Sequence, residues 1–170
     1  MRTVLNLNAK WAFTKQADSI PSAIDNKWDF VSLPHSWNAL DGQDGGNDYY
    51  RGTCVYETRF PCPAFDRANE QIYLQFDGVN ASARVLLNGQ VAMTHDGGYS
   101  TFRANITDLL TAENELRVEV DNSVNDRVYP QKADFTFYGG IYRDVKLITL
   151  NKYHFDMDHF GGRGLWAWTC

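Results

Sequence analysis

A carboxylate stands among aromatic residues in the stretch ADFTFYGGIYRDVKLI, which runs from Ala133 to Ile148. Most of this stretch is typical of a buried strand with an aromatic approach, but Asp134 is not. An ionised carboxylate in apolar surroundings costs free energy unless hydrogen bonds satisfy it. We therefore expect Asp134 to be held either by a backbone turn or by a bound ligand.

Two further groups of side chains are of types that can bind a cation. The first lies in DGQDGGND and consists of Asp41, Asp44, Asn47 and Asp48. Its spacing differs from that of a twelve-residue calcium loop, so a solvated turn is expected. The second lies in HFDMDHF and consists of His154, Asp156, Asp158 and His159. There we expect a tail that continues an extended segment, and we predict no metal in either group.

Acid–base hydrolysis of a glycoside normally needs two carboxylates at a set separation. The Asn114-Glu115 pair could mark such an acid, but Glu115 lies on the polar face of an alternating segment and is interpreted as a solvated glutamate. The sequence contains no GxSxG motif, no P-loop and no Rossmann glycine pattern. We therefore predict no catalytic residue and no cofactor in this chain.

The segments that must position these residues have the period of β-strands. NELRVEVDN alternates, with Leu116, Val118 and Val120 on one face, and EQIYLQFDG and GTCVYETRF alternate in the same way. Asn88-Gly89 stands between two apolar runs and predicts a two-residue hairpin turn. Further strands are expected at Val4–Asn8, Phe30–Leu33, Ser100–Ile106 and Tyr142–Leu150. ITDLLTAE predicts a short helical turn capped by Thr107 or Asp108.

No helical pattern of 10–15 residues alternates with the strands, which argues against a parallel α/β sheet. We predict an all-β fold, an antiparallel β-sandwich of the jelly-roll type. The 170 residues suit one domain. The longest stretch without a strand pattern runs from Asn38 to Gly52, and loops of that length are usually functional or mobile.

Composition excludes some classes of partner. The net charge is −5 with no block of like charge, so nucleic acid and anionic membranes are poor partners. The five Trp and nine Tyr indicate either an aromatic core or a surface that stacks on flat apolar faces such as sugar rings. No apolar run reaches the length of a membrane span or signal peptide, so a cytoplasmic location or a removed signal is expected. Cys54, Cys62 and Cys170 lack paired spacing and are expected to be free thiols.

Six motifs occur in order along the chain: WDFVSLPHSWN, DYYRGTCVYETRF, IYLQFDGVNASARVLLNG, HDGGYSTFRANIT, NELRVEVDN and YGGIYRDVKLI. Together they resemble the N-terminal sugar-binding domain of glycoside hydrolase family two, the β-galactosidase and β-glucuronidase family. The resemblance spans roughly Trp11 to Gly162. It implies a galactose-binding-domain-like jelly roll within an enzyme that hydrolyses β-glycosides with retention.

In that family the catalytic glutamates belong to a later barrel domain. The resemblance therefore implies a non-catalytic first domain, without the barrel and the immunoglobulin-like domain that would be its partners. It also implies that Asp134 contacts hydroxyls of the sugar being cleaved, with Asn47 or Asp48 as a second polar contact. Carbohydrate is then a partner only in the full enzyme, and the uncovered docking surface predicts self-association.

The end of the chain departs from the family pattern. Arg163 stands where a proline is expected, and Trp166, Trp168 and Cys170 match nothing in that pattern. A truncated or frameshifted gene, or an altered end, would produce such a sequence. We therefore expect a jelly-roll domain over residues 1–160 and a divergent tail over residues 161–170.

Two functions remain open from the sequence. The domain either binds sugar within a β-glycosidase, or it is a structural module that packs against partners and has no measurable affinity for sugar. The surroundings of Asp134 separate them, because a carboxylate satisfied by backbone N–H groups favours the structural module.

Overall fold

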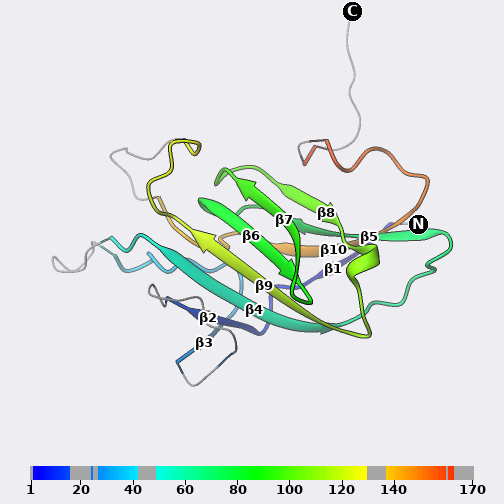
Figure 1. The fold of residues 1–170 in the computed structure, drawn as a ribbon, viewed down its shortest axis with the longest axis horizontal. Helices are drawn as coiled ribbons and strands as arrows, with labels where there is room; N and C mark the ends of the chain where they lie inside the picture. Colours follow the sequence, from blue (N-terminus) through cyan, green and yellow to red (C-terminus); the bar gives the residue numbers. More distant parts are fainter. Residues whose placement is uncertain are drawn as a thin grey trace, which may run out of the picture.

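Two antiparallel β-sheets pack face to face in the computed structural model of this chain (Figure 1). The structure describes residues 2–15, 24, 27–41, 49–129, 137–159 and 161–162. The first sheet has the strand order β1 (Thr3–Asn6), β10 (Val145–Asn151), β5 (Glu70–Phe76) and β8 (Phe102–Asn105). The second has the order β3 (Asp29–Val31), β2 (Trp11–Thr14), β4 (Thr53–Pro61), β9 (Glu113–Asp121), β6 (Ser82–Leu87) and β7 (Gln90–Asp96).

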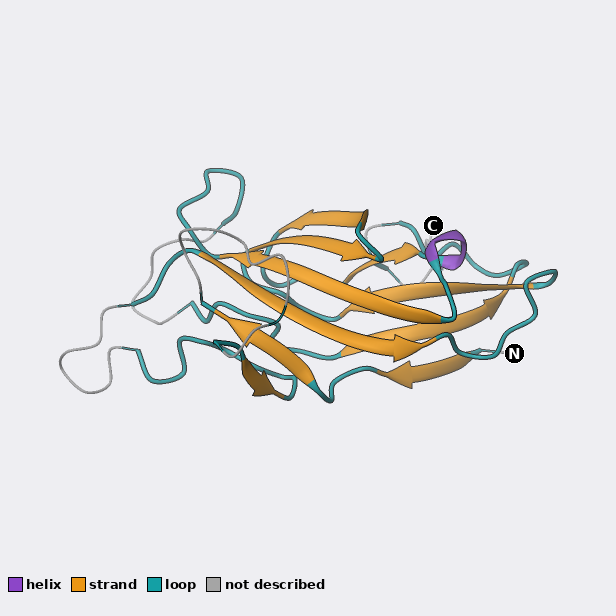
Figure 2. Cartoon of the chain, turned by 60° about the horizontal axis from the view of Figure 1, so that its bottom comes forward, coloured by secondary structure: helices purple, strands orange, loops and turns teal. Residues whose placement is uncertain are grey.

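The predicted all-β antiparallel sandwich is thus confirmed, and its core lies between the two sheets. Strand β9 buries Leu116, Val118 and Val120 against the other layer, as its alternation predicts. Strand β5 contributes Ile72, Leu74 and Phe76 from the opposite side. The short 3₁₀ helix η1 (Thr107–Leu109) lies at one end of the sandwich, and the described residues just before β4 (49–52) and just after β9 (122–129) lie at the other end (Figures 1 and 2).

The hairpin prediction is also confirmed. Asn88 and Gly89 connect β6 to β7 with φ angles of 52° and 79°, the left-handed geometry of a two-residue hairpin turn. The predicted cap of η1 is wrong. Thr107 is the first residue of η1, and the residue at the N-cap position is Ile106, which makes no side-chain cap. Asn105 instead accepts a hydrogen bond from the N–H of Thr107.

The segment after β10 also differs from the expectation of an extended tail. Residues 152–159 form successive bends, and Met157 packs with Tyr73, Ile148 and Leu150 on the outer face of the four-stranded sheet. Burying the Met157 side chain supplies apolar contacts that an extended tail would lack.

The outer face of β4 is covered at Val55 and Glu57, whereas Arg59 on the same face is exposed. Val55 is buried with Ala12 and Trp28, and Glu57 is 2% exposed beside Arg117. Of the three cysteines, Cys54 is buried and Cys62 is half-buried, and both are free thiols, while Cys170 lies outside the described residues. Burial raises the pKa of Cys54 to about 12, which keeps it a thiol. Within the described ranges, no helix is long and apolar enough to cross a membrane.

Candidate functional site

Two buried asparagines join distant loops at the end of the sandwich opposite η1. The Asn38 Oδ1 atom accepts a hydrogen bond from the N–H of Gly139 at 2.7 Å, and its Nδ2 donates to the Tyr50 carbonyl at 3.1 Å. The Asn122 Nδ2 donates to the same Tyr50 carbonyl at 3.0 Å, and its Oδ1 accepts from the N–H of Gly52. The segment before β4 is therefore fixed relative to the segment before β10.

A third asparagine, Asn80, holds the same segment from the other side. Asn80 and Gly140 exchange two backbone hydrogen bonds, of 3.0 and 3.1 Å. The Asn80 Nδ2 also donates to the Tyr138 carbonyl at 3.0 Å, and the Ser36 hydroxyl donates to the Gly139 carbonyl. Satisfied buried amides of this kind rigidify a site.

The glycine pair of the YGGIYR motif is required by close approach. A Cβ atom on Gly139 would overlap the ring of Trp37. Gly140 has a φ of +130°, and a Cβ there would lie 2.5 Å from the His35 carbonyl oxygen and 2.8 Å from the Tyr56 hydroxyl. The backbone therefore crosses directly over these residues, which only glycine permits.

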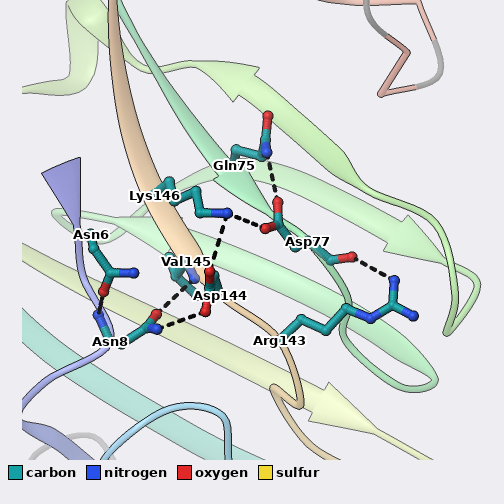
Figure 3. Close-up of polar contacts among 8 residues, drawn as sticks. All are labelled: Asn6, Asn8, Gln75, Asp77, Arg143, Asp144, Val145 and Lys146. Carbon is teal, nitrogen blue, oxygen red and sulfur yellow. Dashed lines mark hydrogen bonds and ion pairs between the residues drawn. The ribbon is translucent and has the colours of Figure 1, made fainter. Parts of the chain in front are cut away.

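A charged cluster fixes the far end of the same segment, as Figure 3 shows. Lys146 pairs with Asp77 and, at 3.2 Å, with Asp144. The Asn8 side chain donates to Asp144 at 2.8 Å and accepts from the N–H of Val145 at 3.0 Å. The hydrogen bonds from Asn8 and Lys146 lower the pKa of Asp144, and the one to Asp77 raises the pKa of Lys146. Asn8, which follows β1, and Asp77, which follows β5, thus anchor the segment together with Lys146 as it enters β10.

A small cleft opens between these anchored segments. Its volume is about 20 Å³, and it is lined by Tyr49, Arg51, Asn80, Ala81, Asn122, Ser123, Val128 and Phe137. Tyr49 directly follows residues 42–48, and Phe137 directly follows residues 130–136. The described ends of two loops that are far apart in the sequence therefore line one cleft, which we call the Asn80 cleft.

Comparison with known proteins identifies the family of this sandwich. Residues 47–158, well over half of the chain, match the family model described as glycosyl hydrolase 2 galactose-binding domain-like. The chain belongs to this family. The predicted resemblance and the galactose-binding-like fold are thereby confirmed for this domain.

The relatives of this galactose-binding-like domain are named as glycosidases. A solved FMN-binding beta-glucuronidase from Facaelibacterium prausnitzii is 42% identical, with a TM-score of 0.85 over 95% of this chain and 24% of that one. A Bacteroides fragilis beta-glucuronidase is 37% identical over 74% of this chain and 20% of its own length. A Thermoanaerobacter pseudethanolicus beta-galactosidase is 31% identical over 90% and 22%. The chain spans about a fifth of the length of the curated relatives that it matches.

The predicted sugar contacts Asp134, Asn47 and Asp48 lie outside the described residues, as does Asp44. Asp41 of the same polar group holds a turn, because its carboxylate accepts hydrogen bonds from the Asn38 side chain and the N–H of Tyr50. Burial raises the pKa of Asp41, but these two hydrogen bonds outweigh it and hold the pKa below its ordinary value.

Two further sequence predictions concern Glu115 and the HFDMDHF segment. Glu115 pairs with Arg59 at 2.8 Å and remains partly exposed, in agreement with its interpretation as a surface residue. In the HFDMDHF segment, Asp156 accepts from the N–H of Asp158, and His154 contacts the Phe155 carbonyl. Among the described residues, no group of three or more acidic, histidine or cysteine side chains is arranged to hold a metal ion.

His35 packs beneath the glycine pair, and its shifted pKa makes the stability of the domain depend on pH. Its Nδ1 atom lies 2.7 Å from the Tyr56 hydroxyl, and its ring contacts Phe13. Burial, and then the charge of Lys15, lowers the pKa of His35 in the folded domain. The unfolded chain therefore binds a proton on this residue at a higher pH than the folded chain does.

We expect the melting temperature of this domain to fall as pH is lowered from about 7 to about 5.5. Stability linked to His35 is present above the ordinary histidine pKa and is lost as the pH drops below it. His35→Gln should reduce this slope, leaving the part due to His95, whose pKa burial also lowers. Thermal melts at several pH values measure the slope, and an unchanged slope in the variant would contradict this role of His35.

Proposed function

We propose that this galactose-binding-like domain forms a sugar-facing wall of the active site in a longer retaining β-glycosidase. The observation that carries the proposal is the Asn80 cleft, because Tyr49 and Phe137 at the ends of two separate loops both line it. The loop before Tyr49 contains Asn47 and Asp48, and the loop before Phe137 contains Asp134. The names of the relatives, β-glucuronidases and β-galactosidases, support glycoside chemistry.

In this proposal Asp134 accepts hydrogen bonds from hydroxyl groups of the sugar. A carboxylate is an acceptor only, so it suits neighbouring sugar hydroxyls. One such charge-assisted contact contributes about 1.5–3 kcal/mol. The hydrogen bonds of Asn38 with Gly139 and of Asn80 with Tyr138 support the role, because they fix the segment that follows Asp134 before any sugar arrives. The sugar itself is a glucuronide or a galactoside, the two classes that the relatives' names give.

The wall supplies no catalytic group, so the 170-residue chain alone should not hydrolyse β-glycosides above the uncatalysed rate. Retaining hydrolysis needs two carboxyl groups about 5–5.5 Å apart, and we assign both to another part of the longer enzyme. Assays on nitrophenyl β-galactoside, β-glucuronide and β-mannoside measure this. Turnover that survives repurification, and disappears when an internal glutamate is replaced, would contradict the assignment.

Sugar contact by the wall itself is tested by titrating the isotope-labelled chain with methyl β-galactoside and methyl β-glucuronide. The contact of one carboxylate does not offset the roughly 4 kcal/mol or more that is lost on association, so binding should be no tighter than about millimolar. The amide signals of Tyr49 and Gly139 should shift progressively with ligand. If neither methyl glycoside shifts them at about 100 mM, far above the millimolar range, the domain is a packing module instead.

A further inference from the structure

Two exposed tyrosines stand beside the Asn80 cleft. Tyr99, in the loop between β7 and β8, is 52% exposed, and Tyr138 is 47% exposed. Asn80 holds both of their backbone segments. Its Nδ2 donates to the Tyr138 carbonyl at 3.0 Å, and its Oδ1 lies so close to Gly98 that a Cβ there would overlap it. A single side chain of the cleft therefore bonds to the backbone of Tyr138 and packs against Gly98, the residue before Tyr99.

The turn that carries Tyr99 is fixed on both sides of this residue. Before it, the N–H of Gly97 donates to the Ala81 carbonyl at 3.0 Å, and the Gly98 carbonyl accepts the Tyr142 hydroxyl. After it, the Ser100 hydroxyl lies 3.0 Å from the Nε2 of His95. A tyrosine on a fixed backbone loses little entropy when a ligand covers its ring, because it has only two side-chain torsions.

Tyr99 also interacts electrostatically with a tyrosine that lines the cleft. Burial raises the pKa values of both Tyr49 and Tyr142, and the nearby Tyr99 adds to the rise in each case. Tyr49 lines the cleft, and the Tyr142 hydroxyl is bound at Gly98. Tyr99 thus interacts with Tyr49, which lines the Asn80 cleft, and with Tyr142, while half of its surface remains open to solvent.

We propose that Tyr99 and Tyr138 form a stacking platform for a second ring of the β-glycoside, on the other side of the scissile bond from the sugar that Asp134 contacts. The inference rests on the proposed function and adds the chemistry of the leaving group. The platform takes a ring with a flat apolar face, namely a pyranose whose C–H groups cover the tyrosine ring. The tyrosine hydroxyls can bind the hydroxyl groups at the edge of that pyranose.

The test compares matched ligands on the 170-residue chain by nuclear magnetic resonance titration. Methyl β-galactoside is compared with lactose, and methyl β-glucuronide with a disaccharide that ends in β-linked glucuronic acid. The disaccharide of the matching sugar should bind about 2- to 13-fold more tightly than its methyl glycoside. Phenyl β-glycosides form a separate arm, and a larger gain with phenyl than with the disaccharide would overturn the assignment to a pyranose.

Variants separate the platform from the rest of the cleft. Tyr99→Ala and Tyr138→Ala should abolish the gain of the disaccharide, whereas Tyr99→Phe should keep most of it. Tyr153→Ala is the matched control, because Tyr153 is 96% exposed and follows Lys152, whose N–H donates to the carbonyl of Asn69, the residue before β5. It should leave the gain unchanged.

The outcomes for the two proposals are distinguishable. If methyl glycosides shift the cleft signals but disaccharides gain nothing, or the gain survives both alanine variants, the platform is wrong and the proposed function stands. If no glycoside shifts the cleft signals at about 100 mM, the proposed function fails and the platform fails with it.

Discussion

Replacing Gly140 by alanine should lower the free energy of unfolding by about 3 kcal/mol or more. The φ angle of +130° is one that alanine rarely adopts, and this alone costs about 1–3 kcal/mol. The new Cβ would also lie 2.5 Å from the His35 carbonyl oxygen, a backbone atom that cannot turn away. His35 is itself bonded to Ile141 through its N–H, so the clash strains the segment that leads to the Asn80 cleft.

Gly89→Ala is the matched control for this prediction. Gly89 also has a positive φ, of +79°, but nothing lies within 4 Å of the place where its Cβ would be. The Gly89→Ala substitution should therefore lower the free energy of unfolding only by the backbone strain, about 1 kcal/mol. Urea denaturation of both variants measures the difference. Equal losses would show that close packing over His35 contributes nothing, contrary to the anchoring described above.

The strands were predictable where one face is buried and the other is not. Strand β9 alternates apolar and charged residues, and the Asn88-Gly89 turn has a specific backbone requirement, so both could be read from the sequence. Strand β2 was missed because all four of its residues are buried and it shows no alternation. Burial of Val55 beneath Trp28 likewise depends on a loop that periodicity does not reveal.

The anchoring of the cleft could not be predicted from local pattern. An asparagine in a loop usually indicates a turn, whereas Asn38 bonds to a residue 101 positions away. The ordered motifs contain these residues, although nothing in the motifs singled them out. Asn38 lies in LPHSWN, Asn80 in GVNAS, Asn122 in VEVDN, and the glycine pair in YGGIYR. The structure gives each of these motifs a physical reason, since they meet at one end of the sandwich.

In a complete relative, replacing the aspartate that aligns with Asp134 by alanine should lower kcat/KM about 10- to 150-fold. This range is the conversion of the 1.5–3 kcal/mol that one charge-assisted contact contributes. Loss of a contact that strengthens in the transition state lowers kcat, whereas loss of a contact that binds substrate and transition state equally raises KM. Replacing the aspartate that aligns with Asp41 is the control, because Asp41 holds a turn and its loss should act through stability.

The most direct test of the sugar-facing wall is a paired measurement on Asp134→Asn, which keeps the shape of the side chain but removes its charge. The melting temperature of the 170-residue chain is measured together with kcat/KM of the complete relative carrying the equivalent change. We expect the melting temperature to stay within about 1 °C, since 1 kcal/mol corresponds to about 2–4 °C at this size. We expect kcat/KM to fall at least about tenfold. A fall of several degrees in the melting temperature with kcat/KM unchanged would show that Asp134 is a turn cap, which contradicts the proposed role.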